Sequence, residues 1–435
     1  MNKTAFILII STLIIFSSCK TQQNKSDETS TPEQTTKNDT LVIQGLEITL
    51  NLDTIIPKEP ALEERIIDFA HDFQKNIAPK QKANYVSSPV SLYLAMGMIY
   101  EGAKNNTLEE IQNTMNFPKS ELFYEQMSPY YKALLEMNAE TNMKMNIANK
   151  VYLENSFQIL PEYQQNLNTL FKTNIEKVDF KNQFSKVENQ INKWVEKETQ
   201  NKIKQLLPKS TLTKETLMVL VNAIYLKAAW RYPFNESATT EKDFFINEKE
   251  TVKTKFMTQR KKGFKHYSNK RISVLEMPYQ TNHLSLLIIL PKTSTNEKIN
   301  RWIPNQNEYQ YYLDHLKYET VYMEIPKFKI ESNFDLGEHL SSMGIKEAFT
   351  NFADFSGISG KKEAKIDKVI QKVFFEIDEK GTEAAAATAV VMVRTTSVNP
   401  NLETPVNFIA NKPFIFILKE NTNNTPLFMG TYSRP

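Results

Sequence analysis

The sequence contains very little cysteine and little glycine, and each shortage excludes a class of protein. Its 435 residues include a single cysteine, Cys19, which rules out a disulfide framework and a metal site built from several cysteines. Ten glycines are few against a usual share of about 7%, and neither GxxxxGK[ST] nor GxGxxG after a strand occurs. We therefore expect no nucleotide chemistry, no cofactor and no metal.

A strong excess of either charge is also absent. The 53 basic and 50 acidic residues leave a formal charge of only +3, which is too small to draw nucleic acid or an acidic membrane over long range. A partner must therefore be recognised locally. Hydrophobic residues make up 40% of the chain, enough for a sizeable core in one large domain or two small ones.

The N-terminus has the pattern of an export signal. An apolar stretch from Ala5 to Phe16 is shorter than the roughly 20 residues of a membrane-spanning helix, and the small residues Ser17 and Ser18 follow it. This stretch, the small residues and the cysteine resemble the bacterial lipoprotein box, although Phe16 stands where leucine is usual. The resemblance implies that Cys19 becomes the lipidated first residue of the mature protein. The alternative is an ordinary secretion signal that happens to contain a cysteine.

A tether is predicted between this signal and a compact domain. Residues 20–40 contain no aliphatic or aromatic side chain and cannot bury enough surface to fold. Alternating leucine and isoleucine at 46–52 predict a short strand, to which we assign no function. We therefore divide the chain into a signal peptide at 1–18, a lipidated tether at 19–61 and one domain at 62–435. The lipid would anchor the protein to a bacterial outer membrane, on its periplasmic or cell-surface face; otherwise the protein is secreted.

Within the domain, helical patterns precede strand patterns. Apolar residues at 66–73 fall on one face of a helix, and Ser88 is a plausible cap for a second helix that begins at Pro89. Further helical stretches are expected to about Leu206. Later runs rich in Val, Ile, Leu and Tyr are predicted as strands: Met218–Leu226, Ile272–Met277, Leu284–Leu290 and Thr320–Ile325. Helices followed by strands predict an α+β domain.

One segment does not fit an ordinary loop. After the strand-like Val369–Ile377, the ten residues 384–393 carry no charge, although loops usually lie in water and are polar. Four alanines favour a helix, whereas the valines at 390, 391 and 393 favour a strand. This conflict is typical of a segment with two conformations. The alternative is a small-residue helix or linker that ends in a core strand.

As a strand, this segment would present one face without any charge. That face would carry Thr382, Ala384, Ala386, Thr388, Val390 and Met392. The segment could therefore enter the interior of a sheet, starting from Thr382. About 14 added residues at roughly 1 kcal/mol net per ladder bond would contribute about 10 kcal/mol, which is comparable with the stability of a whole domain. Such an insertion would be effectively irreversible.

The residues around this segment resemble the serpin family. The run Glu379, Lys380, Gly381, Thr382, Glu383, Ala384, Ala385, Ala386, Ala387 and Thr388 looks like the hinge of inhibitory serpins almost residue for residue. The other matching blocks, in order, are Asn84–Ser91, Glu101–Lys104 with Thr107, Val221–Lys227 with Trp230 and Phe234, Pro326–Phe328, Ala353–Gly357, Phe408–Leu418 and Leu427–Gly430. The resemblance covers the chain from about residue 62 to its end. It implies a multi-helix domain with a large central β-sheet, further sheets and an exposed reactive-centre loop at about 379–407.

The resemblance also implies a function. A serpin is cut in its loop as a substrate, forms an acyl bond to the protease, and traps that protease as the cut loop inserts into the large sheet. We therefore expect an irreversible inhibitor rather than an enzyme, as a monomer that forms a covalent 1:1 complex with a serine protease. No nucleic-acid partner is expected.

The point of cleavage stays open between neighbouring bonds. The family's usual count from Gly381 makes Thr395 the scissile residue, with Thr396 after it, whereas Arg394 suits a trypsin-like pocket with an acidic base. We prefer Arg394–Thr395 for trypsin-like targets. For elastase-like or subtilisin-like targets we keep Thr395–Thr396, or a cut after residue 392 or 393.

The resemblance further implies a polar cluster beneath the sheet that controls its opening. This cluster would include Ser88, Ser91 and Asn222, with Gln371 at the position where the family usually has a histidine. An amide can donate and accept hydrogen bonds, but it does not titrate near neutral pH as imidazole does. Trp230 would cover the top of the sheet, where insertion begins.

Rival functions have less support from the sequence. A hydrolase is disfavoured because neither HExxH nor GxSxG occurs, and we expect each histidine to be at the surface or a satisfied core residue: His71, His266, His283, His315 and His339. A non-inhibitory serpin that acts as a binding or structural protein typically loses the small hinge residues or carries a charge at the position of Thr382, and this chain does neither. Activation by a polyanion needs a basic helix surface, but residues 108–145 mix acids and lysines.

Overall fold

The computed structural model describes residues 38–43, 46–51, 59–81, 83–137, 143–292, 298–382 and 404–435. The chain divides into two units, Met1–Glu59 and Pro60–Pro435. In the first unit, β1 (Asn38–Ile43) and β2 (Leu46–Asn51) form an antiparallel hairpin, which confirms the short strand expected at 46–52 as far as Asn51. Cys19 and residues 20–37 of the tether lie outside the described residues. Among the helices that are described, none has both the length and the apolar character needed to cross a membrane.

Most of the helices of the second unit come early in the chain. They are α2 (Leu62–Ile77), α3 (Pro89–Tyr100), α4 (Asn105–Met115), α5 (Ser120–Met137), α6 (Pro161–Phe171) and α7 (Phe180–Glu198), followed later by α8 (Gln306–His315), α9 (Gly337–Met343) and α10 (Ser356–Ser359). Short 3-10 turns occur at Ala78–Lys80, Glu236–Ala238, Ile299–Trp302 and Glu347–Phe349. Ser88 caps α3 as predicted, because its hydroxyl accepts a hydrogen bond from the backbone N–H of Ser91 at 3.3 Å.

The strands of the second unit form two sheets. The six-stranded central sheet has the order β12 (Phe328–Asp335), β13 (Lys368–Ile377), β14 (Gly381–Thr382), β6 (Met218–Ala229), β4 (Met143–Glu154) and β5 (Glu176–Val178). The nine-stranded second sheet has the order β15 (Val406–Ile409), β11 (Lys317–Pro326), β8 (Glu250–Ser268), β9 (Ile272–Pro278), β10 (Leu284–Pro291), β16 (Phe414–Glu420), β17 (Pro426–Tyr432) and β3 (Tyr85–Ser87), with β7 (Thr240–Asn247) paired to β8. The four predicted strands are confirmed within β6, β9, β10 and β11.

The expectation of helix throughout the region up to Leu206 was wrong, because β4 and β5 lie within it. The second half of β4 is buried on both faces between two layers of the domain. A strand buried on both faces loses the alternation of polar and apolar residues by which a strand is identified in a sequence.

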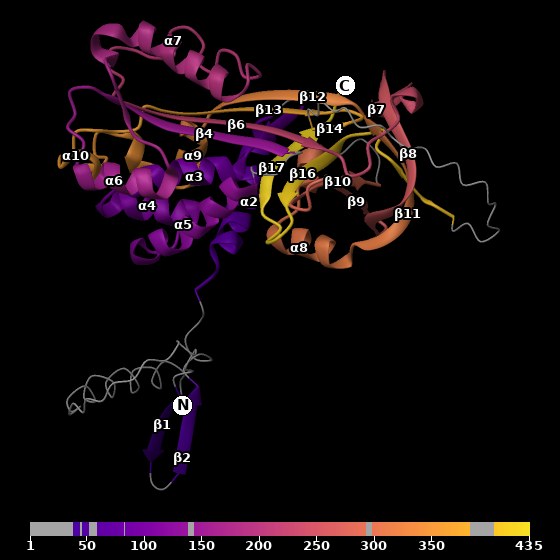
Figure 1. Ribbon diagram of the computed structural model, residues 1–435, viewed down its shortest axis with the longest axis horizontal. Helices are drawn as coiled ribbons and strands as arrows, with labels where there is room; N and C mark the ends of the chain where they lie inside the picture. The colour runs from indigo at the N-terminus through magenta and orange to yellow at the C-terminus, as the bar shows by residue number, and fades with distance from the viewer. Residues whose placement is uncertain are drawn as a thin grey trace. The chain divides into compact units, whose positions relative to one another are not determined.

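The central sheet is covered on both faces, as Figure 1 shows, with α7 on one face and the other helices of the N-terminal half on the opposite face. Strand β6 is almost completely buried. Val219, Val221 and Ala223 pack in a cluster with α7, whereas Leu220 and Ile224 belong to the larger core on the other face. This layered arrangement is the α+β fold that the sequence predicted.

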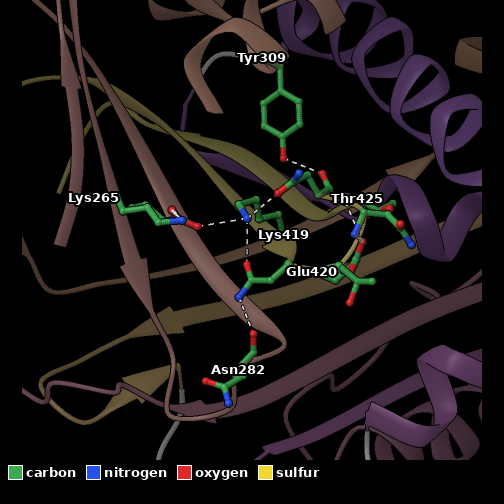
Figure 2. Close-up of polar contacts among 11 residues, drawn as sticks. Lys265, Asn282, Tyr309, Lys419, Glu420 and Thr425 are labelled. Atoms are coloured by element: carbon green, nitrogen blue, oxygen red, sulfur yellow. Dashed lines mark hydrogen bonds and ion pairs between the residues drawn. The ribbon is translucent and has the colours of Figure 1, made fainter. Parts of the chain in front are cut away.

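A buried ion pair joins β9 to β16, the first strand of the C-terminal hairpin (Figure 2). The Lys419 ammonium lies 3.1 Å from Glu276 Oε1 and donates to Asn421 Oδ1 at 2.9 Å and Asn424 Oδ1 at 2.8 Å. The two charged side chains are only 4% and 7% exposed. Tyr309 of α8 donates to the Asn424 carbonyl at 2.8 Å, which fastens the helix to the same turn.

The next residue, Glu420, shapes that turn (Figure 2). Its carboxylate accepts backbone hydrogen bonds from Thr422 at 2.7 Å, Asn423 at 2.7 Å and Thr425 at 3.2 Å. Three backbone N–H donors of the turn are satisfied in this way, so the chain can reverse direction between β16 and β17 without leaving these donors unpaired.

Replacing the buried carboxylate of the ion pair tests how much the fold depends on it. Burial by itself would raise the pKa of Glu276, but Lys419 and Lys265 outweigh burial and hold this pKa below its usual range. A carboxyl of this kind stabilises the fold above its unfolded pKa of about 4.5, and the contribution is lost as the pH falls through the folded pKa. Glu276→Gln should lower the free energy of unfolding at pH 7 by about 3–5 kcal/mol in urea titrations, because the buried Lys419 loses the carboxylate that it contacts directly.

Glu125→Gln on the exposed surface of α5 is the matched control and should change the free energy of unfolding by less than about 0.5 kcal/mol. The difference between wild type and Glu276→Gln should shrink below pH 4.5. An equal effect of the two variants at pH 7 would show that the ion pair does not stabilise the fold.

Candidate functional site

The chain leaves β13 through a tight turn that leads it back into the central sheet. The Asp378 carboxylate accepts the backbone N–H groups of Lys380 at 2.8 Å and Gly381 at 3.1 Å, and Asp378 N–H donates to the Gly381 carbonyl at 2.9 Å. Gly381 has a φ of +152°, and a Cβ there would lie 2.1 Å from the carbonyl oxygen of Ala228. Only glycine fits this approach of two backbones.

The turn places β14 between β13 and β6. Thr382 pairs antiparallel with Ile377 of β13 on one side and with Ala228 of β6 on the other. Further along, β13 and β6 pair directly with each other in parallel, residues 368–373 with residues 219–224. The two strands are thus separated at one end of the sheet and joined over the rest, and β14 occupies the start of the place that an additional strand would take.

Trp230 and Tyr279 enclose this entry point. Trp230 donates from its indole to the Asp378 carbonyl at 2.9 Å and from its backbone to the Lys380 carbonyl at 2.8 Å. Its ring stacks on Tyr279, with 4.3 Å between centroids, and the Tyr279 hydroxyl is hydrogen-bonded to the Thr382 hydroxyl. Burial raises the pKa of Tyr279 well above its usual value, so this phenol is a neutral hydrogen-bonding group at all physiological pH values.

Glu379 is anchored outside the sheet. Its carboxylate lies 2.7 Å from the Lys327 ammonium and accepts the Thr239 hydroxyl at 2.7 Å, while its carbonyl accepts the backbone N–H of Phe234 at 2.8 Å. Burial would raise the pKa of Glu379, but the hydrogen bonds from Lys327 and Thr239 hold it below its usual range. The chain is therefore fixed as far as Glu379, and its entry into the sheet starts at Gly381.

Three amides lie in register across the central sheet below the entry point: Gln371 on β13, Asn222 on β6 and Asn149 on β4. Gln371 Nε2 donates to Asn222 Oδ1 at 2.6 Å. Asn222 Nδ2 in turn donates to Asn149 Oδ1 and to the Ser91 hydroxyl at 2.5 Å. Gln371 and Asn222 have no exposed surface. A direct side-chain bond therefore spans the junction between β13 and β6.

The N-terminus of α3 binds this row from beneath. Ser88 donates its N–H to Gln371 Oε1 at 3.2 Å and accepts from Gln371 Nε2 at its carbonyl at 2.9 Å. Asn149 Nδ2 donates to the Ser91 carbonyl at 3.0 Å. We call Ser88, Ser91, Asn149, Asn222 and Gln371 the amide cluster. It contains no ionisable group, and separation of β13 from β6 must break its Gln371–Asn222 bond.

The structure brings four predicted residues together in this cluster, Ser88, Ser91, Asn222 and Gln371, and it places Trp230 at the entry point. Two contributing residues were missed. Asn149 lies in the stretch that was wrongly expected to be helical, so its register with Asn222 could not be seen. Tyr279 follows the predicted strand 272–277, but no spacing in the sequence relates it to Trp230.

Several predicted site residues cannot be compared with the structure. Glu383, Ala384, Ala385, Ala386, Ala387 and Thr388 of the hinge, the candidate cleavage residues Arg394, Thr395 and Thr396, and Cys19 lie outside the described residues. The described part of the hinge comprises Glu379, Lys380, Gly381 and Thr382.

The described part of the chain contains a triad-like arrangement of side chains, and it is buried. There, no three side chains of the His, Cys, Asp or Glu type are placed to hold a metal. His266 lies 2.7 Å from Glu319 and 2.8 Å from Ser273, the hydrogen-bonding order of a hydrolytic triad. However, His266 and Ser273 are only 5% and 7% exposed, so His266 is the satisfied core histidine that the sequence predicted.

Comparisons with known proteins all point to one protein family. The model of a family described as Serpin (serine protease inhibitor) matches residues 64–435. Serpin B4 of Homo sapiens is 33% identical over 401 residues, which cover 86% of this chain and all of that protein. The leukocyte elastase inhibitor of Xenopus laevis is 32% identical over 390 residues, or 84% of this chain and 97% of that protein. The crystal structure of Serpin48, a highly specific serpin of the insect Tenebrio molitor, superposes with a TM-score of 0.75 at 29% identity, covering 87% of this chain and all of that one.

A histidine in the amide cluster should make the stability of the fold depend on pH. Neutral imidazole can replace the Gln371 amide, but imidazolium would be a buried charge among uncharged partners. The folded pKa in Gln371→His should therefore lie below the unfolded value of about 6.5, and stability should fall as the pH drops through 6.5. We expect a further loss of about 1.4 kcal/mol between pH 8 and pH 5.5, relative to wild type, in urea titrations.

Comparison with wild type at each pH cancels the contributions of the other histidines. Gln371→Asn, which shortens the amide without adding a titratable group, is the matched control and should lose the same amount of stability at both pH values. A pH-independent difference between Gln371→His and wild type would refute the predicted environment of residue 371.

Proposed function

This chain belongs to the serpin family, and from that premise we propose that it is an irreversible, suicide-substrate inhibitor whose cut loop inserts into the central sheet. Inhibition of serine proteases as its general activity is supported by the family and by inhibitor relatives. The observation that carries the proposed mechanism is β14, the two residues of the hinge that already pair between β13 and β6.

Insertion would exchange one ladder of backbone hydrogen bonds for two. The parallel pairing of residues 368–373 with residues 219–224 would be lost, and the loop would pair antiparallel with both strands, as Thr382 does now. Parallel pairing is slightly less stable per residue than antiparallel pairing. With about 14 inserted residues and about 1 kcal/mol per ladder bond, the net gain is about 10 kcal/mol. This free energy would be available to distort an acylated protease before it can deacylate.

The uncut loop is held at both ends, in two different sheets. Its start is fixed at Glu379 and β14 in the central sheet, and its end is fixed in the second sheet, where β15 pairs with β11. Full insertion therefore requires that one connection be broken, which cleavage does. Until then, the amide cluster holds β13 and β6 together, and we propose that it sets the barrier to premature insertion.

A cavity beside β4 supplies room for the sheet to widen. It has a volume of about 950 Å³ and is bounded by residues 147–150 of β4, by α3 and α6, and by Trp194 of α7. An added strand widens a sheet by about 4.8 Å, and a close-packed interior would resist that displacement. We propose that β4 and β6 shift toward this cavity when the loop enters.

The target and the location of the protein are parts of the same proposal. We propose cleavage of Arg394–Thr395 by trypsin-like proteases, with Thr395–Thr396 or a cut after residue 392 or 393 for elastase-like and subtilisin-like proteases.

The inhibitor would act as a monomer, anchored to a bacterial membrane through lipid on Cys19. Metabolic labelling with radioactive palmitate tests the anchor, and the label should be lost in Cys19→Ser.

Incubation with trypsin, elastase and subtilisin, followed by denaturing gels, tests the mechanism. We expect a 1:1 complex with trypsin that survives detergent, together with a carboxy-terminal fragment that begins at Thr395 or Thr396. Cleavage without a complex would contradict inhibition and would favour a non-inhibitory serpin that acts as a binding or structural protein.

A charge at Thr382 should separate cleavage from trapping. This side chain is 1% exposed and bonded to Tyr279, so an arginine at this position would have to be buried at the first step of insertion. Thr382→Arg should still be cut but should need at least about ten times more inhibitor per inactivated protease. Thr382→Ser keeps the hydroxyl and should behave as wild type; equal stoichiometry for both variants would contradict insertion at this point.

A further inference from the structure

The pairing of β14 fixes where each later residue of an inserted strand would lie. Thr382 pairs antiparallel with Ile377 of β13 and with Ala228 of β6. Gln371 and Asn222, which pair with each other, lie six residues before Ile377 and Ala228 on their strands. The two strands therefore have the same offset beside β14 as in their own parallel ladder. An inserted strand requires that they separate sideways by one strand spacing, about 4.8 Å, without sliding along each other.

Counting along the two ladders assigns one residue of the loop sequence to the row of the amide cluster. In an antiparallel ladder, one step forward on a strand is matched by one step back on its partner. The residue six positions after Thr382 is Thr388, so an inserted Thr388 would pair with Gln371 on one side and Asn222 on the other. An even number of steps keeps the same face of the sheet. Thr388 would therefore share the face on which Thr382 contacts Tyr279.

On this face, the row of Gln371 and Asn222 is a polar row between apolar rows. Between residues 369 and 377 of β13 and between residues 220 and 228 of β6, the other side chains of this face are apolar and belong to the larger core. They are Val369, Val373, Phe375 and Ile377 on β13, and Leu220, Ile224, Leu226 and Ala228 on β6.

The loop sequence has the matching order of polar and apolar residues. The residues that would share the face of Thr388 are alanine at 384 and 386 and valine at 390. In this register, a polar side chain meets the polar row and apolar side chains meet the apolar rows. A slip of two residues would instead place Ala386 or Val390 against the two amides. The register set by β14 is thus the one that matches polarity across the new strand.

Separation of the two strands would break the bond from Gln371 Nε2 to Asn222 Oδ1, which is 2.6 Å long. Neither residue has exposed surface, so bulk water does not replace the lost partner. One N–H of Gln371 and the side-chain oxygen of Asn222 would then be buried without a hydrogen bond, which costs free energy. The other N–H of Gln371 has its own acceptor, the Ser88 carbonyl at 2.9 Å.

A hydroxyl between the two amides restores both hydrogen bonds. A threonine hydroxyl has one donor and two acceptor lone pairs. It can therefore donate to Asn222 Oδ1 and accept from Gln371 Nε2 at the same time. Valine has nearly the same shape as threonine, but it can do neither.

We infer that the amide cluster, which joins β13 to β6 in the uncut protein, receives the Thr388 hydroxyl when the cut loop inserts. This inference rests on the proposed function and adds to it a positioning residue for insertion. Residues 368–370 of β13 and 219–221 of β6 lie beyond this row, so insertion is incomplete when the cluster is reached. Without the hydroxyl, insertion would slow at this row and leave the acylated protease more time to deacylate.

Three full-length variants test this contact in reactions with trypsin. Thr388→Val should consume at least about five times more inhibitor per inactivated trypsin, because two buried polar groups stay unpaired and slow insertion. Thr388→Ser keeps the hydroxyl and should stay within about twofold of wild type. Ala386→Thr/Thr388→Ala has the composition of wild type but moves the hydroxyl to the apolar row of Val373 and Ile224. It should be impaired at least as much as Thr388→Val.

The rate of cleavage separates positioning from a general disturbance of the loop. Because Thr388 would act after the cut, kcat/KM for cleavage by trypsin should agree within about twofold among wild type and all three variants. Equal consumption of inhibitor by Thr388→Val, Thr388→Ser and the permuted variant, with a detergent-stable complex still formed, would refute the contact and leave the proposed function standing.

Urea titration of the cut chain covers the case in which no complex forms. If cutting nevertheless raises the urea midpoint of wild type, the loop inserts although inhibition fails. A lower midpoint for cut Thr388→Val than for cut Thr388→Ser then supports the contact, and equal midpoints overturn it. If cutting leaves the midpoint of wild type unchanged, the loop does not insert, and both the proposed function and the contact are refuted.

Discussion

The parallel pairing of β13 with β6 is the contact on which the rest of the molecule depends. The two strands lie inside a sheet that helices cover on both faces. Their backbone pairing is parallel, which is slightly less stable than antiparallel pairing, and one buried amide pair, Gln371 with Asn222, reinforces it. This pairing is stable in the uncut protein, but an inserted strand that pairs antiparallel with both β13 and β6 would be more stable. In the proposed mechanism, the strand that replaces it would come from the adjacent loop, which begins at β14.

The described hinge residues have two roles: Glu379 anchors the chain, and Gly381 and Thr382 enter the central sheet. Glu379 is held by charge and hydrogen bonds at the rim of the sheet, whereas Gly381 passes so close to β6 that no side chain is tolerated. Thr382 then pairs on both sides and satisfies its hydroxyl with Tyr279. The close approach of β6 explains why glycine stands at the first position of entry, and the contacts of Glu379 with Lys327 and Thr239 hold the chain just before it.

Much of this organisation could be predicted from the sequence, but geometry between distant segments could not. The cap at Ser88 and the strands of the second half follow from local preference and periodicity. Asn149 and Tyr279 could not be found in this way, because their roles depend on registers set by contacts far apart in the chain. Strand β4 was expected as helix since burial on both faces removes alternation.

The attachment of the loop to two different sheets has a consequence for reversibility. In an inhibitor whose cut ends stay side by side, the protease can rejoin them and release the intact chain. Here the end after the cut would stay with β15, while about 14 residues at roughly 3.4 Å each would carry the other end some 45 Å along the central sheet. Religation across that distance is impossible. Under the proposed mechanism, every inhibited protease would therefore consume one molecule of inhibitor, and protection would last only as long as synthesis replaces the spent molecules.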